Sequence, residues 1–319
     1  MLLEIEHHLR FDYSVFVRES HMEVRVEPRT QSGQVLHEFE LAVGPHTQPT
    51  RHEDWLGNAL HWFSITDFHE RVEVVAKSLV ETSPPAVQPT ELADQIDGLT
   101  DSLNSWDFLQ FGGPIIRSER LEQLAISLDL LSCELVGSVI ERISRSLHSY
   151  IVYQPLVTNF LSTSDESIEK RGGVCQDFAH VTLALLRLCG IACRYVNGYL
   201  HVDPTNKPAE SHAWVEVLSP SHGWVGFDPT HRCAPDEGHV VVAYGRHYND
   251  VPPNRGIFRG AATERLHAEV RTTPVERRER PHVTQPVVME VPVFTEPPDQ
   301  ASGLQLRSDE AAAQQQQQQ

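Results

Sequence analysis

Apolar and polar residues alternate along most of the first eighty or so residues of the chain. A period of two places the apolar side chains on one face of a strand, and that face must be buried against a second layer. Turn-forming stretches such as GPHTQPT at 44–50 separate the alternating segments. The pattern therefore predicts an antiparallel β-sandwich over residues 1–82. Its inward positions are Leu3, Ile5, His7 and Leu9, then Met22, Val24 and Val26, then Phe39, Leu41 and Val43, and finally Val72, Val74 and Ala76.

The alternation stops between residues 83 and 118. This stretch contains SPPAVQPT and FGGP, in which proline and glycine fall where neither a helix nor a strand continues comfortably. We expect residues 83–118 to form a linker or connecting arm.

Apolar positions recur at helical spacing further along the chain. They predict helices over 119–131, 137–149 and 175–189, and Gly190 suits the end of the last one. After that glycine the period returns to two, in CRYVNGYLHV, HAWVEVL and GWVGFDP. Helices followed by a run of antiparallel strands predict an α+β domain over residues 119–277.

The end of the chain has a different composition. Residues 278–319 are rich in proline, glutamate and glutamine, and the last six are all glutamine. Such a segment buries too little apolar surface to fold, so we expect it to be disordered.

Acidic residues clearly outnumber basic ones. The 319 residues include 44 Asp plus Glu and 26 Lys plus Arg, a formal charge of −18 at pH 7. This charge argues against nucleic acid as a partner. No apolar run approaches the roughly 20 residues of a membrane-spanning helix, and the N-terminus lacks the continuous apolar stretch of a signal peptide. We therefore expect a cytoplasmic protein without a membrane partner.

Five cysteines, at positions 133, 175, 189, 193 and 233, are an odd number for a disulfide framework. Cys189 and Cys193 have no second pair of ligands at the spacing of a zinc site. We expect no metal and no cofactor, and we expect four of the five cysteines to be small buried hydrophobic residues. Cys175 is the exception.

Cys175 follows Gly172 and Gly173 and opens the predicted helix 175–189. The first turn of a helix has unpaired N–H groups and the positive end of the helix dipole, which favour an anion such as a thiolate. The glycines leave room for a substrate beside the sulfur. The position of Cys175 therefore indicates a reactive thiol.

A thiol nucleophile needs a base, and the base needs a group that orients it. His212 begins the strand HAWVEVL and Asp228 ends the strand GWVGFDP. If the strands pair so that Trp214 opposes Asp228 or Gly226, the imidazole and the carboxylate share one face as neighbours. Each residue alone has a commoner structural role, but their joint occurrence favours a Cys175, His212 and Asp228 site.

Other side chains are weaker candidates for contact with a substrate. Tyr153 and Gln154 precede the cysteine segment, and Gln176 follows the cysteine directly, so each is a candidate oxyanion donor or substrate ligand. Trp214 is a candidate wall of a substrate groove, although aromatic residues on strands more often belong to the core.

Asp177 and His180 lie in the same predicted helix as Cys175. A second acid–base pair is one interpretation. A carboxylate that favours the helix dipole and a histidine on a helix face is the commoner one.

Three blocks of the sequence resemble the bacterial transglutaminase-like superfamily: RGGVCQDFAHVTLALLRLCGIACRYVNGYL, ESHAWVEV and GWVGFDPTH. The resemblance extends to YQPLVTNF and to VAYGRHYNDVPPNRGIFRG, and the N-terminal RVEPRTQSGQ and DWLGNALHWFSI are similar to the β-domain of many bacterial members. It covers about residues 1–277. It implies a papain-like α+β catalytic domain with Cys175 as nucleophile, His212 as general base and acid, and Asp228 as its orienting group.

Two positions depart from the commonest form of the family. His247 stands where an aspartate is usual, and residues 83–135 are longer or more divergent. Neither departure involves the three predicted catalytic residues, so they affect substrate contacts.

The predicted site attacks an amide or ester carbonyl of a protein or peptide and forms a thioester on Cys175. If water resolves the thioester, the protein is a peptidase or amidase. This is the leading hypothesis because the resemblance implies a bacterial family with many suspected proteases, and because no acidic cluster has the spacing of the calcium loop that activates animal transglutaminases. If an amine resolves it, the protein is a transglutaminase. A third interpretation is a binding module without activity. The sequence does not predict an oligomeric state.

Overall fold

The computed structural model describes residues 1–99, 105–202, 210–276 and 291–294, so most of the predicted tail at 278–319 lies outside the described residues. The chain forms two compact units. Unit 1 comprises Met1–Thr82, Leu200–Glu210 and Pro252–Gln319, and unit 2 comprises Ser83–Tyr199 and Ser211–Val251. In the described ranges, fourteen strands outnumber four α-helices.

Unit 1 contains two four-stranded sheets in which every pairing is antiparallel. The first has the order β14 (Glu264–Pro274), β1 (Leu2–Val17), β6 (His69–Thr82) and β3 (Gln34–Gly44). The second has the order β13 (Asn254–Arg259), β2 (Glu19–Val24), β5 (Ala59–Ile65) and β4 (Thr50–Glu53).

Side chains of both sheets meet in one hydrophobic core. Burial alternates residue by residue along most of β1, as the period of two predicts. The core includes Phe11 of β1, Val24 of β2 and Val74 of β6, whereas Phe39 and Leu41 of β3 are only partly buried against it. The predicted inward positions thus hold the two sheets together.

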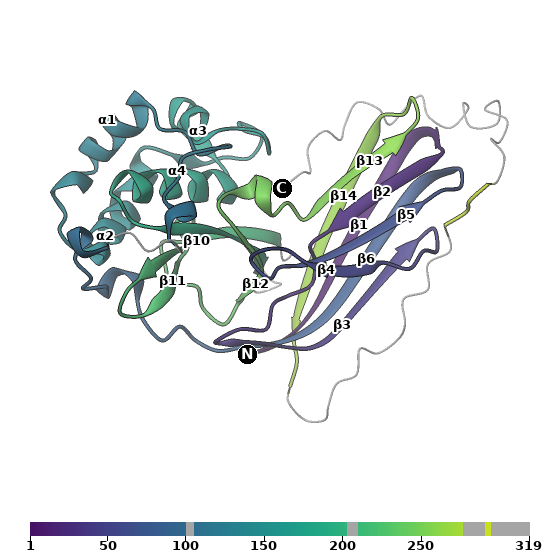
Figure 1. The fold of residues 1–319 in the computed structure, drawn as a ribbon, viewed down its shortest axis with the longest axis horizontal. Helices are drawn as coiled ribbons and strands as arrows, with labels where there is room; N and C mark the ends of the chain where they lie inside the picture. The colour runs from purple at the N-terminus through teal and green to yellow at the C-terminus, as the bar shows by residue number, and fades with distance from the viewer. Residues whose placement is uncertain (100–104, 203–209, 277–290, 295–319) are drawn as a thin grey trace. The chain divides into compact units, whose positions relative to one another are not determined.

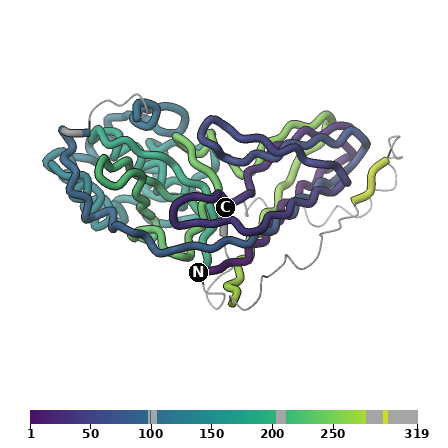
Figure 2. The backbone as a smooth tube through the Cα atoms, turned by 60° about the horizontal axis from the view of Figure 1, so that its bottom comes forward, coloured from purple at the N-terminus to yellow at the C-terminus, as the bar shows by residue number. Residues whose placement is uncertain are grey.

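The two last strands of unit 1 come from the far end of the described chain. Strand β14 pairs with β1 from Leu3 opposite Pro274 to Tyr13 opposite Glu264, and β13 pairs with β2. Figure 1 shows both pairings, and in Figure 2 the green C-terminal strands run alongside the purple N-terminal ones. The predicted end of the catalytic domain at residue 277 was therefore wrong, because β1 and β2 need hydrogen-bonding partners that local periodicity does not identify.

Unit 2 combines the helices with a four-stranded sheet. Its helices are α1 (Glu119–Ser127), α2 (Val136–Ser146), α3 (Ser164–Lys170) and α4 (Cys175–Leu188). Its sheet has the order β11 (Gly223–Phe227), β10 (Glu210–Ser219), β9 (Cys193–Leu200) and β12 (His239–Gly245), and a short parallel pair joins β7 (Val152–Tyr153) to β8 (Gly172–Gly173). Among the described residues, no helix is both long and apolar enough to cross a membrane.

The predicted helices differ from the observed ones mainly at their ends. The first two end earlier as α-helices and are followed by single 3₁₀ turns at Leu130–Ser132 and Leu147–Ser149. Helix α3 was not predicted. Its N-terminus is a capping box, in which the side chains of Thr163 and Glu166 each bond the other's backbone N–H.

Residues 83–118 are part of unit 2, so the predicted linker was wrong. Leu92, Phe108 and Ile115 in this stretch are buried. The backbone N–H of Gly137 in α2 donates to the carbonyl of Leu92 at 3.0 Å. Proline and glycine prevent regular structure here, but they do not prevent packing.

Arg187, near the end of α4, ties this stretch to the rest of the unit. The residue is 4% exposed, and its guanidinium donates to four backbone carbonyls. These belong to Phe108 at 3.1 Å, Gln110 at 2.7 Å, Cys193 at 3.2 Å and Arg246 at 2.5 Å. The Arg187 side chain thus donates hydrogen bonds to four carbonyls that belong to three separate segments of unit 2.

Replacing Arg187 by methionine should lower the free energy of unfolding by about 3 kcal/mol or more, because buried carbonyls lose a charged donor. Urea unfolding followed by tryptophan fluorescence measures the loss. Arg145→Met is the matched control, since that side chain is 71% exposed and pairs only across a turn of α2. Equal effects of the two substitutions would contradict the role assigned to Arg187.

Candidate functional site

Cys175 is the first residue of α4, as predicted, and its side chain is partly exposed. Val174 precedes it in an extended conformation and accepts the first intrahelical bond from the N–H of Phe178 at 3.0 Å. The rest of the helix is buried almost completely through Arg187. Cys175 is therefore placed at the positive end of a rigid, buried helix.

Asp177 holds the turn that leads into this helix. It accepts hydrogen bonds from the Val174 N–H at 2.8 Å, the Thr158 hydroxyl at 2.7 Å and the Ser167 hydroxyl at 2.6 Å. A Cβ at Gly173 would lie 2.5 Å from the Asp177 side chain, so the glycine is required there. The contacts of Asp177 thus fit the helix-start carboxylate and not a second acid–base pair.

His180 is a fully buried residue of α4. Its Nε2 accepts a hydrogen bond from the Tyr248 N–H at 3.2 Å, and its ring lies 5.4 Å from that of Tyr195. Burial, followed by the charges of His247 and Arg187, lowers the pKa of His180 to about 3. His180 is therefore a neutral packing residue.

Strands β10 and β11 bring His212 and Asp228 together. Val215 pairs with Phe227 and Glu216 with Gly226, so the register continues to place Trp214 opposite the aspartate. This is one of the two registers considered from the sequence. His212 Nε2 lies 2.7 Å from Asp228 Oδ2, and the two residues are 6% and 0% exposed.

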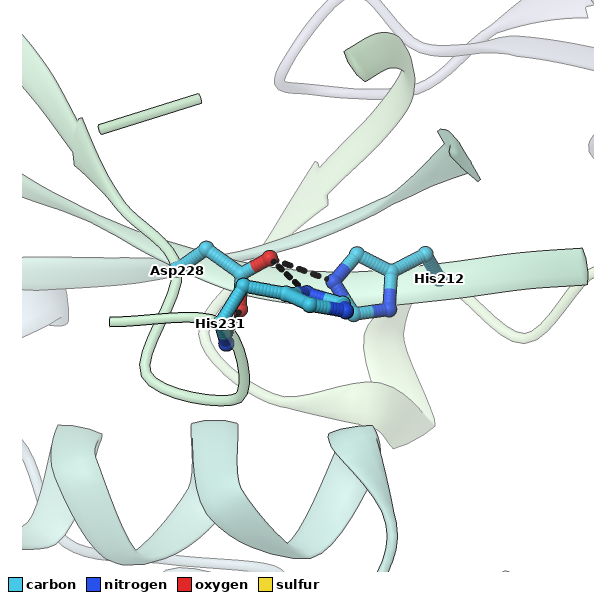
Figure 3. Close-up of side chains that lie close together, drawn as sticks. All are labelled: His212, Asp228 and His231. Carbon is cyan, nitrogen blue, oxygen red and sulfur yellow. Dashed lines mark hydrogen bonds and ion pairs between the residues drawn. The ribbon is translucent and has the colours of Figure 1, made fainter. Parts of the chain in front are cut away.

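Asp228 accepts hydrogen bonds from two further histidines. His231 Nδ1 lies 2.8 Å and His239 Nε2 lies 3.2 Å from the same Oδ2 atom. The other oxygen accepts from the backbone N–H groups of Thr230 at 2.8 Å and His231 at 3.2 Å. Figure 3 shows His212 and His231 approaching the carboxylate together.

The hydrogen bonds determine which nitrogen of His212 is free to act. An ionised carboxylate only accepts, so the nitrogen facing it, Nε2, carries a proton. In the neutral ring the remaining nitrogen, Nδ1, then holds the lone pair. In the neutral ring, the nitrogen of His212 that can accept a proton thus points away from Asp228.

Burial by itself raises the pKa of Asp228, but the hydrogen bonds from His212, His231 and His239 outweigh it and hold that pKa well below its usual range. The hydrogen bond to Asp228 raises the pKa of His231. Burial lowers the pKa of His239, but the hydrogen bonds to Asp228 and Asp236 outweigh burial, so the net shift of that pKa is upward. The carboxylate therefore remains charged in the protein interior.

The sequence did not identify His231 and His239 as partners of Asp228. His231 follows the aspartate by three residues, a spacing that was a usable signal. His239 begins β12, which was not predicted as a strand, so nothing local connected it to the site.

Trp214 lies beneath the site and is fully buried. Its ring stacks on His212 with centroids 5.9 Å apart and meets His239 edge-on at 5.3 Å. A Cβ at Gly198 would lie 2.5 Å from the indole. The suggestion that Trp214 forms the wall of a substrate groove was wrong, because the side chain has no exposed surface to offer.

The candidate oxyanion residues lie around the N-terminus of α4. Tyr153 pairs with Gly173 in the parallel β7–β8 pair and is 41% exposed. The Gln154 N–H donates to the Gly173 carbonyl at 2.8 Å. The Gln176 side chain is 7% exposed and donates to the Phe160 carbonyl at 3.2 Å, which engages its amide in the fold.

Two sets of side chains in the described part of the chain have the donor atoms of a metal site. One is His212, Asp228 and His231, and the other is Asp228, Cys233 and His239. The donor atoms of each set lie within 4.8 Å of one another.

Family models match both units of the chain. The model of the transglutaminase-like superfamily matches residues 134–229, and that of the bacterial transglutaminase-like N-terminal region matches residues 3–81. The first match includes Cys175, His212 and Asp228.

Several bacterial proteins are similar to large parts of the chain. An uncharacterised protein of Mycobacterium tuberculosis strain H37Rv is 31% identical over 275 residues, which are 80% of this chain and 86% of that protein. A second, from Mycobacterium leprae, is 29% identical over 287 residues, or 85% and 98%. A protein-glutamine gamma-glutamyltransferase of Pseudomonas aeruginosa is 27% identical over 186 residues, which are 54% of this chain and 26% of that protein.

One solved structure has the same fold. It belongs to a protein of Cytophaga hutchinsonii described as a candidate cysteine protease, with a TM-score of 0.70 and 21% sequence identity. The match covers 86% of this chain and 92% of that one.

Substituting Asp177 by alanine should cost about 2 to 4 kcal/mol of stability, because the Val174 N–H and two hydroxyls lose their acceptor. Asp177→Asn keeps one acceptor oxygen and should cost about half as much. Urea unfolding measures both, with Glu141→Ala on the exposed side of α2 as the control. If alanine costs no more at position 177 than at 141, the helix start does not depend on Asp177.

Proposed function

The chain belongs to the transglutaminase-like superfamily, and on that premise we propose that it is an enzyme that cleaves amide bonds through Cys175, His212 and Asp228. The observation that carries the proposal is the buried pair of His212 and Asp228, with Nε2 and Oδ2 at 2.7 Å. This pairing leaves Nδ1 of His212 as the base. The proposal requires that nitrogen to reach the Cys175 sulfur.

The first half of the reaction forms an acyl-enzyme. His212 Nδ1 takes the thiol proton, and the sulfur attacks the carbonyl carbon of a peptide or isopeptide amide. The C–N bond then breaks, and the imidazolium returns the proton to the leaving amine. Asp228 stays ionised and stabilises the imidazolium throughout.

The second half of the reaction decides between hydrolysis and transfer. Water attacking the thioester releases an acid and regenerates the thiol, and we favour this outcome because the sequence shows no acidic cluster at calcium-loop spacing. An amine attacking it forms a new amide. The similarity to a bacterial protein-glutamine gamma-glutamyltransferase supports this second candidate.

A binding module without activity is a third candidate. It does not explain why a carboxylate with no exposure is retained at hydrogen-bonding distance from His212. Such a buried charge stabilises a fold weakly, so a catalytic role accounts for it better.

The two antiparallel sheets around one core support a β-sandwich in unit 1, and the helices beside a four-stranded sheet support a papain-like α+β domain in unit 2. Unit 2 contributes all three catalytic residues.

Iodoacetamide at pH 7 should label Cys175 well before the other four cysteines. Burial is the largest cause of a raised pKa in each of the four, to about 11 for Cys193 and Cys233 and about 12 for Cys189, with Cys133 also raised. A thiol with a pKa of about 11 is a thiolate in roughly one molecule in ten thousand at pH 7. Peptide mass spectrometry of labelled protein measures the order.

The Cys175→Ala variant is the control and should remove the fast phase of labelling. As the pH rises toward 11, thiolate forms at the other sites, so the slow phase should accelerate. Equal labelling of all five cysteines at pH 7 would show that Cys175 is not activated.

A glutamine-containing casein with a labelled primary amine separates the two reactions. We expect release of acid or peptide to exceed amine incorporation, with both absent in Cys175→Ala. Incorporated label counts amine transfer, ammonia in excess of that label counts hydrolysis of glutamine side chains, and new amino termini count peptide cleavage, all in the same sample. Incorporation in excess of hydrolysis would replace the peptidase by a transglutaminase.

A further inference from the structure

The catalytic carboxylate is also the centre of a cluster of metal-binding side chains. Three imidazole nitrogens, from His212, His231 and His239, lie 2.7, 2.8 and 3.2 Å from Asp228 Oδ2. Orienting one catalytic histidine needs only the first of these contacts. The other two histidines are not used by the proposed mechanism.

Two histidines and one carboxylate are a donor set that suits zinc and related ions. The donor atoms of His212, Asp228 and His231 lie within 4.8 Å of one another. A tetrahedral ion needs its ligand atoms roughly 3.4 Å apart, so each of the two nitrogens, now 2.7 and 2.8 Å from Asp228 Oδ2, has to move away from that oxygen by about 0.6 to 0.7 Å. The fourth position would be taken by water.

An ion can reach this set from solvent. His231 is exposed on 49% of its side chain and lies on the segment that follows β11, whereas Asp228 is 0% exposed. Figure 3 shows the two histidines on the same side of the carboxylate, where they converge on one oxygen. His231 is therefore the entry ligand, and the buried pair supplies the other two donors.

We propose that His212, Asp228 and His231 bind a divalent transition-metal ion, with Zn²⁺ as the natural case, and that the ion reversibly inhibits the enzyme. The binding site stands on the geometry alone, whereas the inhibition rests on the proposed function.

Inhibition follows from the tautomer of His212. An ion on Nε2 displaces the proton that this nitrogen donates to Asp228. The proton of the neutral ring then resides on Nδ1, the nitrogen that has to accept the thiol proton. The bound ion also occupies Oδ2, so the carboxylate no longer stabilises an imidazolium. One ion thus removes the base without touching the sulfur.

The neighbouring set of Asp228, Cys233 and His239 shares the same carboxylate, so the two sets compete for one ion. His239 is 4% exposed, and its Nδ1 is already hydrogen-bonded to Asp236 Oδ1 at 2.8 Å. Cys233 is only partly exposed, so no ligand of this second set is as open to solvent as His231, which is exposed on 49% of its side chain. The set with His231 is therefore the site, and Cys233 is the matched position for a control.

Equilibrium dialysis of the full chain against ZnCl₂ tests the site without any assay of activity. His231→Ala should weaken zinc binding by at least about tenfold, since even the loss of an outer partner of a metal ligand costs that much. Cys233→Ser and Cys175→Ala should each bind as the unchanged protein does. Circular dichroism of each variant verifies that it is folded.

The same variants distinguish the possible failures. Zinc binding lost in Cys175→Ala but kept in His231→Ala would move the ion to the nucleophile and overturn the site. Zinc binding lost in Cys233→Ser would assign the ion to the neighbouring set and would also overturn the proposed site.

Inhibition is read from iodoacetamide labelling of Cys175, which zinc should slow and a chelator restore. Zinc bound at His231 with labelling unaffected would keep the site and refute the inhibition.

Discussion

The site depends on a carboxylate that has no contact with solvent. Asp228 is 0% exposed, and an isolated charge in that position would be strongly unfavourable. The protein compensates it with three imidazoles and two backbone N–H groups. These bonds position His212, arrange the turn after β11 and anchor the start of β12. The orientation of His212 and the local folding around it are therefore two effects of the same set of hydrogen bonds.

A second buried carboxylate has the corresponding role beside Cys175. Asp177 closes the turn between Gly173 and Cys175, and Arg187 ties the far end of the same helix to surrounding carbonyls. The helix that presents the thiol is thus held at both ends by buried polar contacts. Such support restricts the motion of the first turn, which carries the Cys175 sulfur.

Unit 1 shows how far apart in sequence the partners of one sheet are. Strand β14 at Glu264–Pro274 completes a sheet with β1 at Leu2–Val17, so unit 1 is complete only when both ends of the described fold are present. Along the sequence, the two segments of unit 2 fall between β1 and β14. This arrangement explains why a boundary drawn from local composition placed β13 and β14 with the wrong unit.

The sequence by itself determined the periodic elements, because burial on one face imposes a period of two or 3.6 that can be read locally. It predicted the alternation of β1, the helix that begins at Cys175 and the pairing of His212 with Asp228. Only the tertiary structure decided that residues 83–118 pack into unit 2, that Trp214 is buried, and that His231 and His239 share Asp228. Apart from the short spacing between Asp228 and His231, these features depend on segments that are distant along the chain, and local periodicity does not record which distant segments meet.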